Sequence, residues 1–326
     1  MSKCDWLKKT YLFLLEELRK VYKGFNNGRP RKLSLETMLF ITFIYFKQYI
    51  TFRQLSFYFN VSASTICRSI NYIEQLLSNI LENKNSIQIE NDKRIIIDVT
   101  EIRIERPKYV QNVYYSGKNK CHTIKIQTAI NADSKKIIDF VLDKGSEHDF
   151  NIYKNTAEHF DCKSRIYVDK GYYGINKYHN KVLIPKKNKK KIPLNKNELK
   201  QNQKINKIRI RIEHVFGVLK RYKILSTRYR NHLQKLNTRF FILASIYNYQ
   251  LKNDFWNKSI EEEYDEILKL YFDRYNKIKK EQKEVFENIY FDADVYRFTN
   301  LYHSSYTDYL KSEENIKSIL NKGYNY

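Results

Sequence analysis

The first ninety residues place apolar side chains at a helical period. Apolar positions recur every three or four residues over 6–22 and 33–50, and two further helical stretches cover 52–59 and the residues from 63 onward. A short polar turn separates the last two stretches, and Ser62 stands where a helix N-cap is expected. This pattern predicts an all-α region over residues 1–90.

From residue 93 the period changes to the alternation that is typical of strands. The predicted strands cover 94–104, 121–131, 135–142, 165–168 and 181–184, and the predicted helices cover 150–160 and 205–222. Three successive strands followed by alternating helices and strands predict an α/β core of ribonuclease-H-like type, with a mixed sheet and flanking helices, over 91–250.

Residues 52–77 have the layout of a helix-turn-helix, in which the second helix presents its first turns to the major groove of DNA. Small polar side chains and one arginine crowd the start of that helix, whereas Ile66, Ile70 and Ile73 are expected to face the core. An ordinary helical hairpin is the alternative. The residues predicted to read DNA are Ser62, Ser64, Thr65 and Arg68.

The charge of the chain points to a polyanionic partner. The formal net charge is +24 and the isoelectric point is about 9.6. A bias of an AT-rich genome towards lysine codons would produce part of this excess without any function. The last segment differs, because residues 254–326 hold 15 acidic and 11 basic residues. We expect residues 251–326 to form a helical C-terminal extension whose role the sequence does not define.

Basic residues concentrate in one tract of the predicted core. Residues 181–211 contain 12 lysines and arginines and a single acidic residue, Glu198. The tract is either a solvated loop or a surface that cradles the DNA backbone, and its position before a core helix favours the second interpretation. The loop lysines predicted to contact DNA are Lys186, Lys187, Lys189 and Lys190.

Three carboxylates stand out by their positions. Asp98 lies inside a run of β-branched residues, where a buried charge needs a partner or a metal ion. Asp169 follows the predicted strand 165–168, where functional loops commonly lie. Glu213 shares a helical stripe with Arg209 and Lys220. Taken singly, each has an ordinary explanation: an edge-strand aspartate, a turn aspartate and a solvated ion-pair face.

Together, two strand aspartates and a helix glutamate are able to hold two divalent metal ions for displacement at phosphorus. A set of ligands made only of oxygen atoms suits Mg²⁺ or Mn²⁺ rather than zinc. We therefore expect Asp98, Asp169 and Glu213 to be catalytic metal ligands.

A series of short motifs, in order and with consistent spacing up to about residue 250, resembles the DDE transposases of the insertion-sequence-5 group, which are related to Harbinger-type elements. The matching motifs are Asp98-Val-Thr-Glu-Ile, Tyr114-Tyr-Ser-Gly-Lys, Lys120-Cys-His-Thr-Ile-Lys, Gly145-Ser-Glu-His-Asp, Asp169-Lys-Gly-Tyr-Tyr-Gly, Ile184-Pro-Lys-Lys, Arg211-Ile-Glu-His-Val-Phe-Gly and Ile246-Tyr-Asn.

The resemblance implies an acidic triad at Asp98, Asp169 and Glu213 and DNA contacts at Arg209 and Lys220. The signature tyrosine of this group is replaced by Asn206. The implied function is metal-dependent cleavage and strand transfer at the ends of a transposable element. Its implied partners are double-stranded DNA, in the form of terminal inverted repeats and target DNA, and further copies of the chain. A sequence-specific DNA-binding protein without catalysis and a host nuclease of the same fold are the alternatives.

No stretch of about 18 uncharged apolar residues is present, and the N-terminus lacks the apolar region of a signal peptide. The four cysteines are far apart in the sequence, so no Cys-x-x-Cys metal site is expected. We therefore expect a cytoplasmic protein with no membrane partner, on the nucleoid of a bacterium or in the nucleus of a eukaryote.

Overall fold

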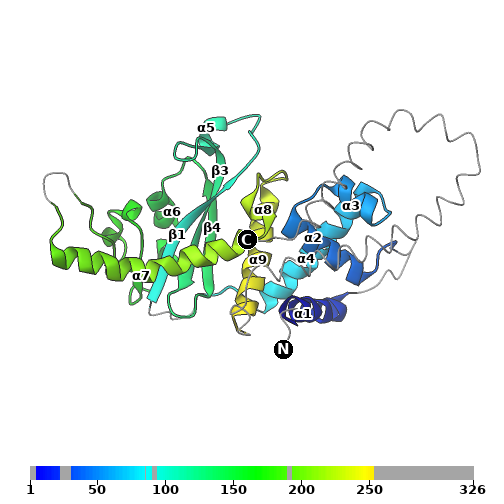
Figure 1. The fold of residues 1–326 in the computed structure, drawn as a ribbon, viewed down its shortest axis with the longest axis horizontal. Coiled ribbons are helices and arrows are strands. Elements are labelled where there is room, and N and C mark those ends of the chain that lie inside the picture. The colour runs from blue at the N-terminus through cyan, green and yellow to red at the C-terminus, as the bar shows by residue number, and fades with distance from the viewer. Residues whose placement is uncertain (1–4, 23–30, 85, 90–93, 189–192, 253–326) are drawn as a thin grey trace, which may run out of the picture. The chain divides into compact units, whose positions relative to one another are not determined.

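Four helices form the N-terminal part of the chain (Figure 1). Their bounds are α1 (Asp5–Val21), α2 (Leu35–Gln48), α3 (Phe52–Tyr58) and α4 (Ala63–Asn83). The structure is a computed structural model, and it describes residues 5–22, 31–84, 86–89, 94–188 and 193–252.

Side-chain caps fix the start of three of these helices. The Ser34 and Ser62 hydroxyls each accept a hydrogen bond from a backbone N–H of the first turn, at 3.2 Å in both helices. A reciprocal capping box between Thr51 and Gln54 begins α3. Ile66, Ile70 and Ile73 are fully buried, as predicted, so α4 turns its other face outward.

The sheet has the strand order of the ribonuclease-H-like fold. Along the sheet the order is β4, β3, β1, β5 and β6, and β2 pairs with β3. β3 pairs antiparallel with both β1 and β4. β5 pairs parallel with β1, and β6 pairs parallel with β5. The strand bounds are β1 (Arg94–Arg103), β2 (Tyr115–Ser116), β3 (Cys121–Asn131), β4 (Ile137–Lys144), β5 (Arg165–Tyr167) and β6 (Val182–Leu183).

Helices cover both faces of the sheet. On one face, Tyr153 of α6 packs in a core with Ile97, Ile166 and Val168. On the other face lie α7 and α9, where the ring of Phe240 lies 4.8 Å from that of Phe140 on β4. Figure 1 shows α7 running across the strands. The helix bounds are α5 (Gln111–Tyr114), α6 (Asp149–Thr156), α7 (Lys196–Leu219), α8 (Lys223–Ser226) and α9 (Gln234–Lys252).

The predicted bounds of α7 were wrong at its N-terminus. The helix begins at Lys196, nine residues before the predicted start, because Asn195 and Glu198 form a capping box there. Much of the basic tract is therefore helical. The strand predicted at 135–142 begins two residues late, since Asn131 and a left-handed Lys135 extend the preceding turn.

Contacts join the N-terminal helices to the rest of the described chain. Arg239 of α9 is fully buried and its Nε lies 2.7 Å from Oε1 of Glu74 on α4. No helix in the described part of the chain is long and apolar enough to span a membrane. The division into parts at residues 90 and 250 stays a prediction, and the extension predicted from 251 lies almost wholly outside the described residues.

Candidate active site and nucleic-acid interface

Two carboxylates meet at the centre of the sheet. The parallel register pairs Ile96 of β1 with Tyr167, the last residue of β5, so Asp98 lies two residues further along β1 and Asp169 lies two residues beyond the end of β5. Both aspartates contact Arg209 of α7, so both lie on the sheet face that this helix covers. β1 lies between β3 and β5, which excludes an edge-strand position for Asp98.

Arg209 of α7 reaches both aspartates. One guanidinium nitrogen lies 3.1 Å from Oδ1 of Asp169 and the other lies 3.6 Å from Oδ2 of Asp98. The arginine side chain is only 11% exposed, and its Nε is buried without a hydrogen-bond partner in the described structure. The carboxylates of Asp98 and Asp169 thus already bind one cation, the guanidinium group of Arg209.

Burial dominates the electrostatics of Asp98. It raises the pKa of this carboxyl to about 6, and the negative charges of Asp169 and Asp149 act in the same direction. The Val99 N–H, which donates to Oδ1 at 2.9 Å, and Arg209 oppose the shift without cancelling it. Asp98 is therefore a carboxylate whose ionised form needs a nearby cation.

Glu213 is one helical turn beyond Arg209 and is exposed. Among the described residues, no three acidic, histidine or cysteine side chains are close enough together to hold a metal ion. Asp98 and Asp169 therefore lie close together, because both contact Arg209. Glu213 lies on the same stripe of α7 as Arg209, but it does not contact either aspartate in the described structure. Ile212 and Val215 of the same helix are buried.

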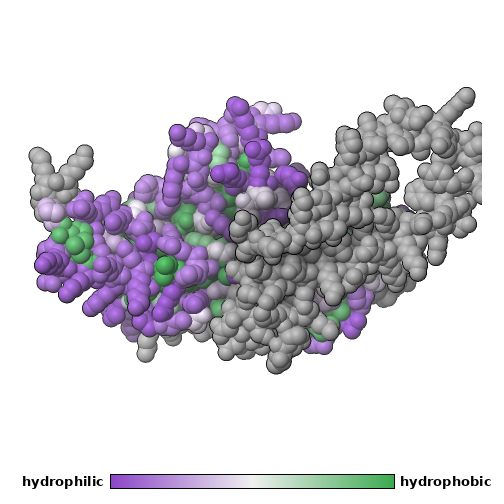
Figure 2. Space-filling model, in the orientation of Figure 1, coloured by the Kyte–Doolittle hydropathy of each residue, from purple (hydrophilic) through white to green (hydrophobic). Residues whose placement is uncertain are grey.

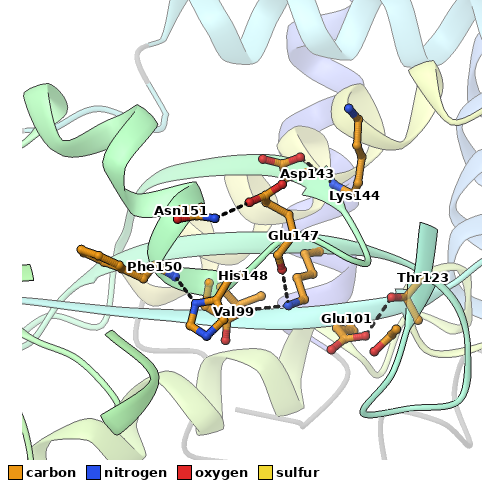
Figure 3. A network of polar contacts seen from close by, with 12 residues as sticks. Val99, Glu101, Thr123, Asp143, Lys144, Glu147, His148, Phe150 and Asn151 are labelled. Atoms are coloured by element: carbon orange, nitrogen blue, oxygen red, sulfur yellow. Dashed lines mark hydrogen bonds and ion pairs between the residues drawn. The ribbon is translucent and has the colours of Figure 1, made fainter. Parts of the chain in front are cut away.

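The start of α6 adds a fourth carboxylate, Asp149, that the sequence did not assign. His148 caps α6, since its Nδ1 accepts the Phe150 N–H at 3.3 Å (Figure 3). Asp149 instead pairs with Lys125 of β3 at 2.8 Å. Lys125 also donates to the Glu147 carbonyl oxygen at 2.6 Å.

The first turns of α4 present the predicted DNA-reading residues. Ser62, Ser64 and Arg68 are exposed and Thr65 is partly exposed. The Ser62 hydroxyl lies 2.9 Å from those of Ser64 and Thr65, and Arg68 Nε donates to the Ser64 carbonyl oxygen at 3.2 Å. These contacts hold a small polar surface at the N-terminus of the helix.

The basic tract divides into a loop and a helix stripe. Lys186 is tied to α7, because its ammonium pairs with Glu198 at 2.9 Å and its backbone binds Asn202. Lys187 lies 5.7 Å from the ring centroid of Tyr173. Lys189 and Lys190 lie outside the described residues.

A lysine stripe along α7 was missed by the sequence analysis. Its members are spaced by four, four and three residues, are all exposed, and therefore follow one side of the helix. The spacing was available in the sequence, but the late predicted start of the helix concealed it. Figure 2 shows a predominantly hydrophilic surface in this region. The lysine stripe consists of Lys196, Lys200, Lys204 and Lys207.

Lys220 is the C-cap of α7 and lies away from the two aspartates along that helix. The side chain is exposed, but partial desolvation lowers the pKa of its ammonium, and the charge of Glu101 partly offsets this effect. Asn206, at the position of the signature tyrosine, is exposed.

Two family models match the chain. The first, described as a transposase DDE domain, matches residues 90–249. The second, described as a helix-turn-helix of DDE superfamily endonuclease, matches residues 31–82.

Similar proteins agree with these matches. A probable transposase for insertion sequence element IS702 of Microchaete diplosiphon is 34% identical over 69% of this chain and 83% of its own length. A putative transposase for insertion sequence element IS112 of Streptomyces albus G is 27% identical over 61% and 73%. A piggyBac transposase synaptic complex with hairpin DNA aligns over 86% of this chain and 79% of that chain at 12% identity and a TM-score of 0.43, too low to carry any argument. The chain belongs to the DDE transposases, enzymes that use divalent metal ions to cut and join DNA.

Proposed function

We propose that the chain cuts DNA at the ends of its own element and joins them to target DNA, with Asp98, Asp169 and Glu213 as the catalytic metal ligands. The observation that carries this proposal is that one cation, Arg209, contacts both Asp98 on β1 and Asp169 just beyond the end of the adjacent parallel strand β5. Glu213 completes the set from α7, one turn from Arg209.

The residues fit a divalent metal. Asp98 and Asp169 offer only oxygen donors, the ligand type that Mg²⁺ and Mn²⁺ prefer, and they already hold a guanidinium charge. When bound, a pair of such ions would supply an activated oxygen nucleophile and charge stabilisation at phosphorus. Arg209 contacts both aspartates and favours the ionised form of Asp98, which is the role that its own contacts support.

DNA recognition is proposed to be divided between two surfaces. Ser62, Ser64, Thr65 and Arg68 read bases of the terminal inverted repeats in the major groove. The lysine stripe, with Lys186, Lys187, Lys189, Lys190 and Lys220, contacts the phosphate backbone of element or target DNA. Two element ends must be joined, so we further propose that several copies of the chain assemble on DNA, in the cytoplasm or wherever the genome lies.

The test is cleavage of a DNA fragment that carries the sequences flanking the coding region, with Mg²⁺ and with EDTA. We expect nicks that leave 3′-hydroxyl groups at the element boundary in Mg²⁺ and none in EDTA. A shuffled fragment of the same length serves as the control. Specific binding without cleavage would instead favour a DNA-binding regulator, and cleavage without boundary preference would favour a nuclease.

A further inference from the structure

A cavity of about 730 Å³ lies beside the candidate active site. Its walls come from the end of β1, the hairpin at 115–119, the loop at 145–149, and the junction of α7 and α8. Two of these walls are the Tyr114-Tyr-Ser-Gly-Lys and Gly145-Ser-Glu-His-Asp motifs, which the proposed chemistry does not use. The volume is within the range of sites that bind small molecules.

The walls are fixed by close packing. A Cβ atom on Gly145 would lie 2.4 Å from Thr123 Oγ1 and 2.5 Å from two backbone carbonyl oxygens, so only glycine fits there. The Ser146 hydroxyl donates to the Val113 carbonyl oxygen at 2.6 Å, and Lys125 ties the Glu147 carbonyl to the Asp149 carboxylate. The loop is therefore held against the residues before the hairpin, and the cavity is preformed.

The cavity lining mixes donors with acceptors. Arg103, Lys118 and Lys220 are exposed and form no ion pair with any residue that the structure describes. Glu101 is half-buried and accepts from the Thr123 hydroxyl at 2.8 Å, and Glu147 is also part of the lining. A site for phosphate alone would not include the three carboxylates of Glu101, Glu147 and Asp149, because they repel it. Cations together with acceptors suit a nucleotide, whose base edge carries donors and whose phosphate is anionic.

Tyr115 supplies a stacking surface. Its side chain lines the cavity and is 45% exposed, and the edge-to-face contact with His122, at 5.7 Å between ring centroids, holds the ring. Aromatic side chains of this kind bind unpaired bases of any sequence by stacking. A paired base has both faces covered by its neighbours and cannot use such a surface.

The cavity adjoins the cleavage chemistry. Val99 and Asp149 line it, and the Val99 N–H donates to Asp98 Oδ1. We propose that the cavity receives one unpaired nucleotide of the DNA strand next to the cut, with its base on Tyr115 and its phosphate near Lys118 and Lys220. This inference rests on the proposed function, because it assumes that the DNA is cut at Asp98.

Binding of a fluorescent eight-nucleotide thymidine strand, measured by anisotropy in EDTA, tests the proposal. Tyr115→Ala should weaken binding about tenfold, as expected for one lost stacked base, and Tyr115→Phe should retain it. Lys118→Ala should flatten the dependence of log K on log salt by about 0.7. Lys144→Ala is the matched control, because this exposed lysine precedes Gly145 without lining the cavity.

An abasic strand of the same length should bind Tyr115→Ala and the parent equally well. Equal binding of the thymidine and abasic strands by the parent would overturn the proposal, as would an equal effect of Tyr115→Ala and Lys144→Ala. Circular dichroism melting checks that each variant is folded. Cleavage of duplex DNA in Mg²⁺ tests the proposed function separately, so that function can stand while the cavity proposal fails.

Discussion

At the scale of single residues, the ionised carboxylate of Asp98 destabilises the folded state. Its carboxyl is largely buried, and burial raises its pKa from 3.8 to about 6. A carboxyl whose pKa is raised by folding stabilises the fold only while it is protonated. That contribution is complete below pH 4 and is lost as the pH rises to about 6. At neutral pH the fold therefore holds a charge that opposes folding and favours cation binding.

Replacing Asp98 by asparagine should therefore stabilise the metal-free protein at high pH. The shift of about two pKa units corresponds to at most about 3 kcal/mol in the free energy of unfolding. We expect Asp98→Asn to exceed the parent by an amount of this order at pH 8 in EDTA, and the difference to vanish near pH 4. Urea unfolding at both pH values measures it. A variant that is less stable than the parent at pH 8 would contradict the assigned burial effect.

Arg68 is an exposed cation among the side chains that we propose to read DNA bases. Arg68→Ala should weaken binding to the element ends about tenfold, as expected for one lost base contact, and should weaken binding to random DNA much less. Arg53→Ala, which removes an exposed arginine from α3, is the matched control and should weaken binding to both DNAs equally. Competition gel shifts give both affinities. Equal losses for Arg68→Ala on the two DNAs would make it a backbone contact.

At the scale of elements, α7 carries the contact with the two aspartates and the lysine stripe on different sides. Arg209 faces the sheet and joins the aspartates, whereas the lysine stripe faces outward over the first three turns. A single long helix thus fixes the distance between the proposed chemistry and a basic surface. This rigid placement favours simultaneous contact of one DNA duplex with the proposed active site and with the lysine stripe.

Two lysines of the stripe provide the test at this scale. The double variant Lys200→Ala/Lys204→Ala should flatten the dependence of log K on log salt by about 1.8 for duplex binding, because two phosphate contacts are lost. Lys163→Ala/Lys177→Ala removes the same charge from exposed positions outside α7 and should leave the slope nearly unchanged. Identical slopes for both double variants would show that the lysine stripe contributes only through the net charge of the protein and not through specific phosphate contacts.

The sequence predicted most elements because their periods are strong. The bounds of β3 were predicted without error, and the cap at Ser62 was correct, since both follow from local chemistry. The start of α7 was missed because its first turns carry few apolar residues to set a period. At the site, adjacency of Asp98 and Asp169 follows from strand order. The contacts of Arg209 and the walls around Gly145 depend on packing between distant segments, which one sequence does not reveal.

At the scale of the whole described molecule, one buried ion pair links the N-terminal helices to α9. Arg239 is fully buried and binds both Glu74 and the Tyr229 hydroxyl, the latter at 3.0 Å. Tyr229 in turn bridges to Ile104, directly after β1. This chain of contacts ties α4 to the catalytic sheet, so the two parts should unfold together.

Glu74→Ala should lower the free energy of unfolding by about 3–5 kcal/mol, because it leaves the Arg239 charge buried and uncompensated. The double variant Glu74→Leu/Arg239→Met, which removes both charges, should recover most of that loss. Urea unfolding gives the free energies, and hydrogen exchange shows whether α4 and β1 open together. A loss below about 1 kcal/mol for Glu74→Ala would show that the pair does not couple them.

The central claim is that Asp98, Asp169 and Glu213 hold the metal that cuts DNA. The most direct measurement is strand cleavage at the element end in Mg²⁺ by Asp169→Asn, with duplex binding measured in parallel. The variant keeps the size and shape of the side chain but removes its negative charge. We predict no detectable cleavage and unchanged binding. Cleavage at the parental rate by this variant would contradict the assignment.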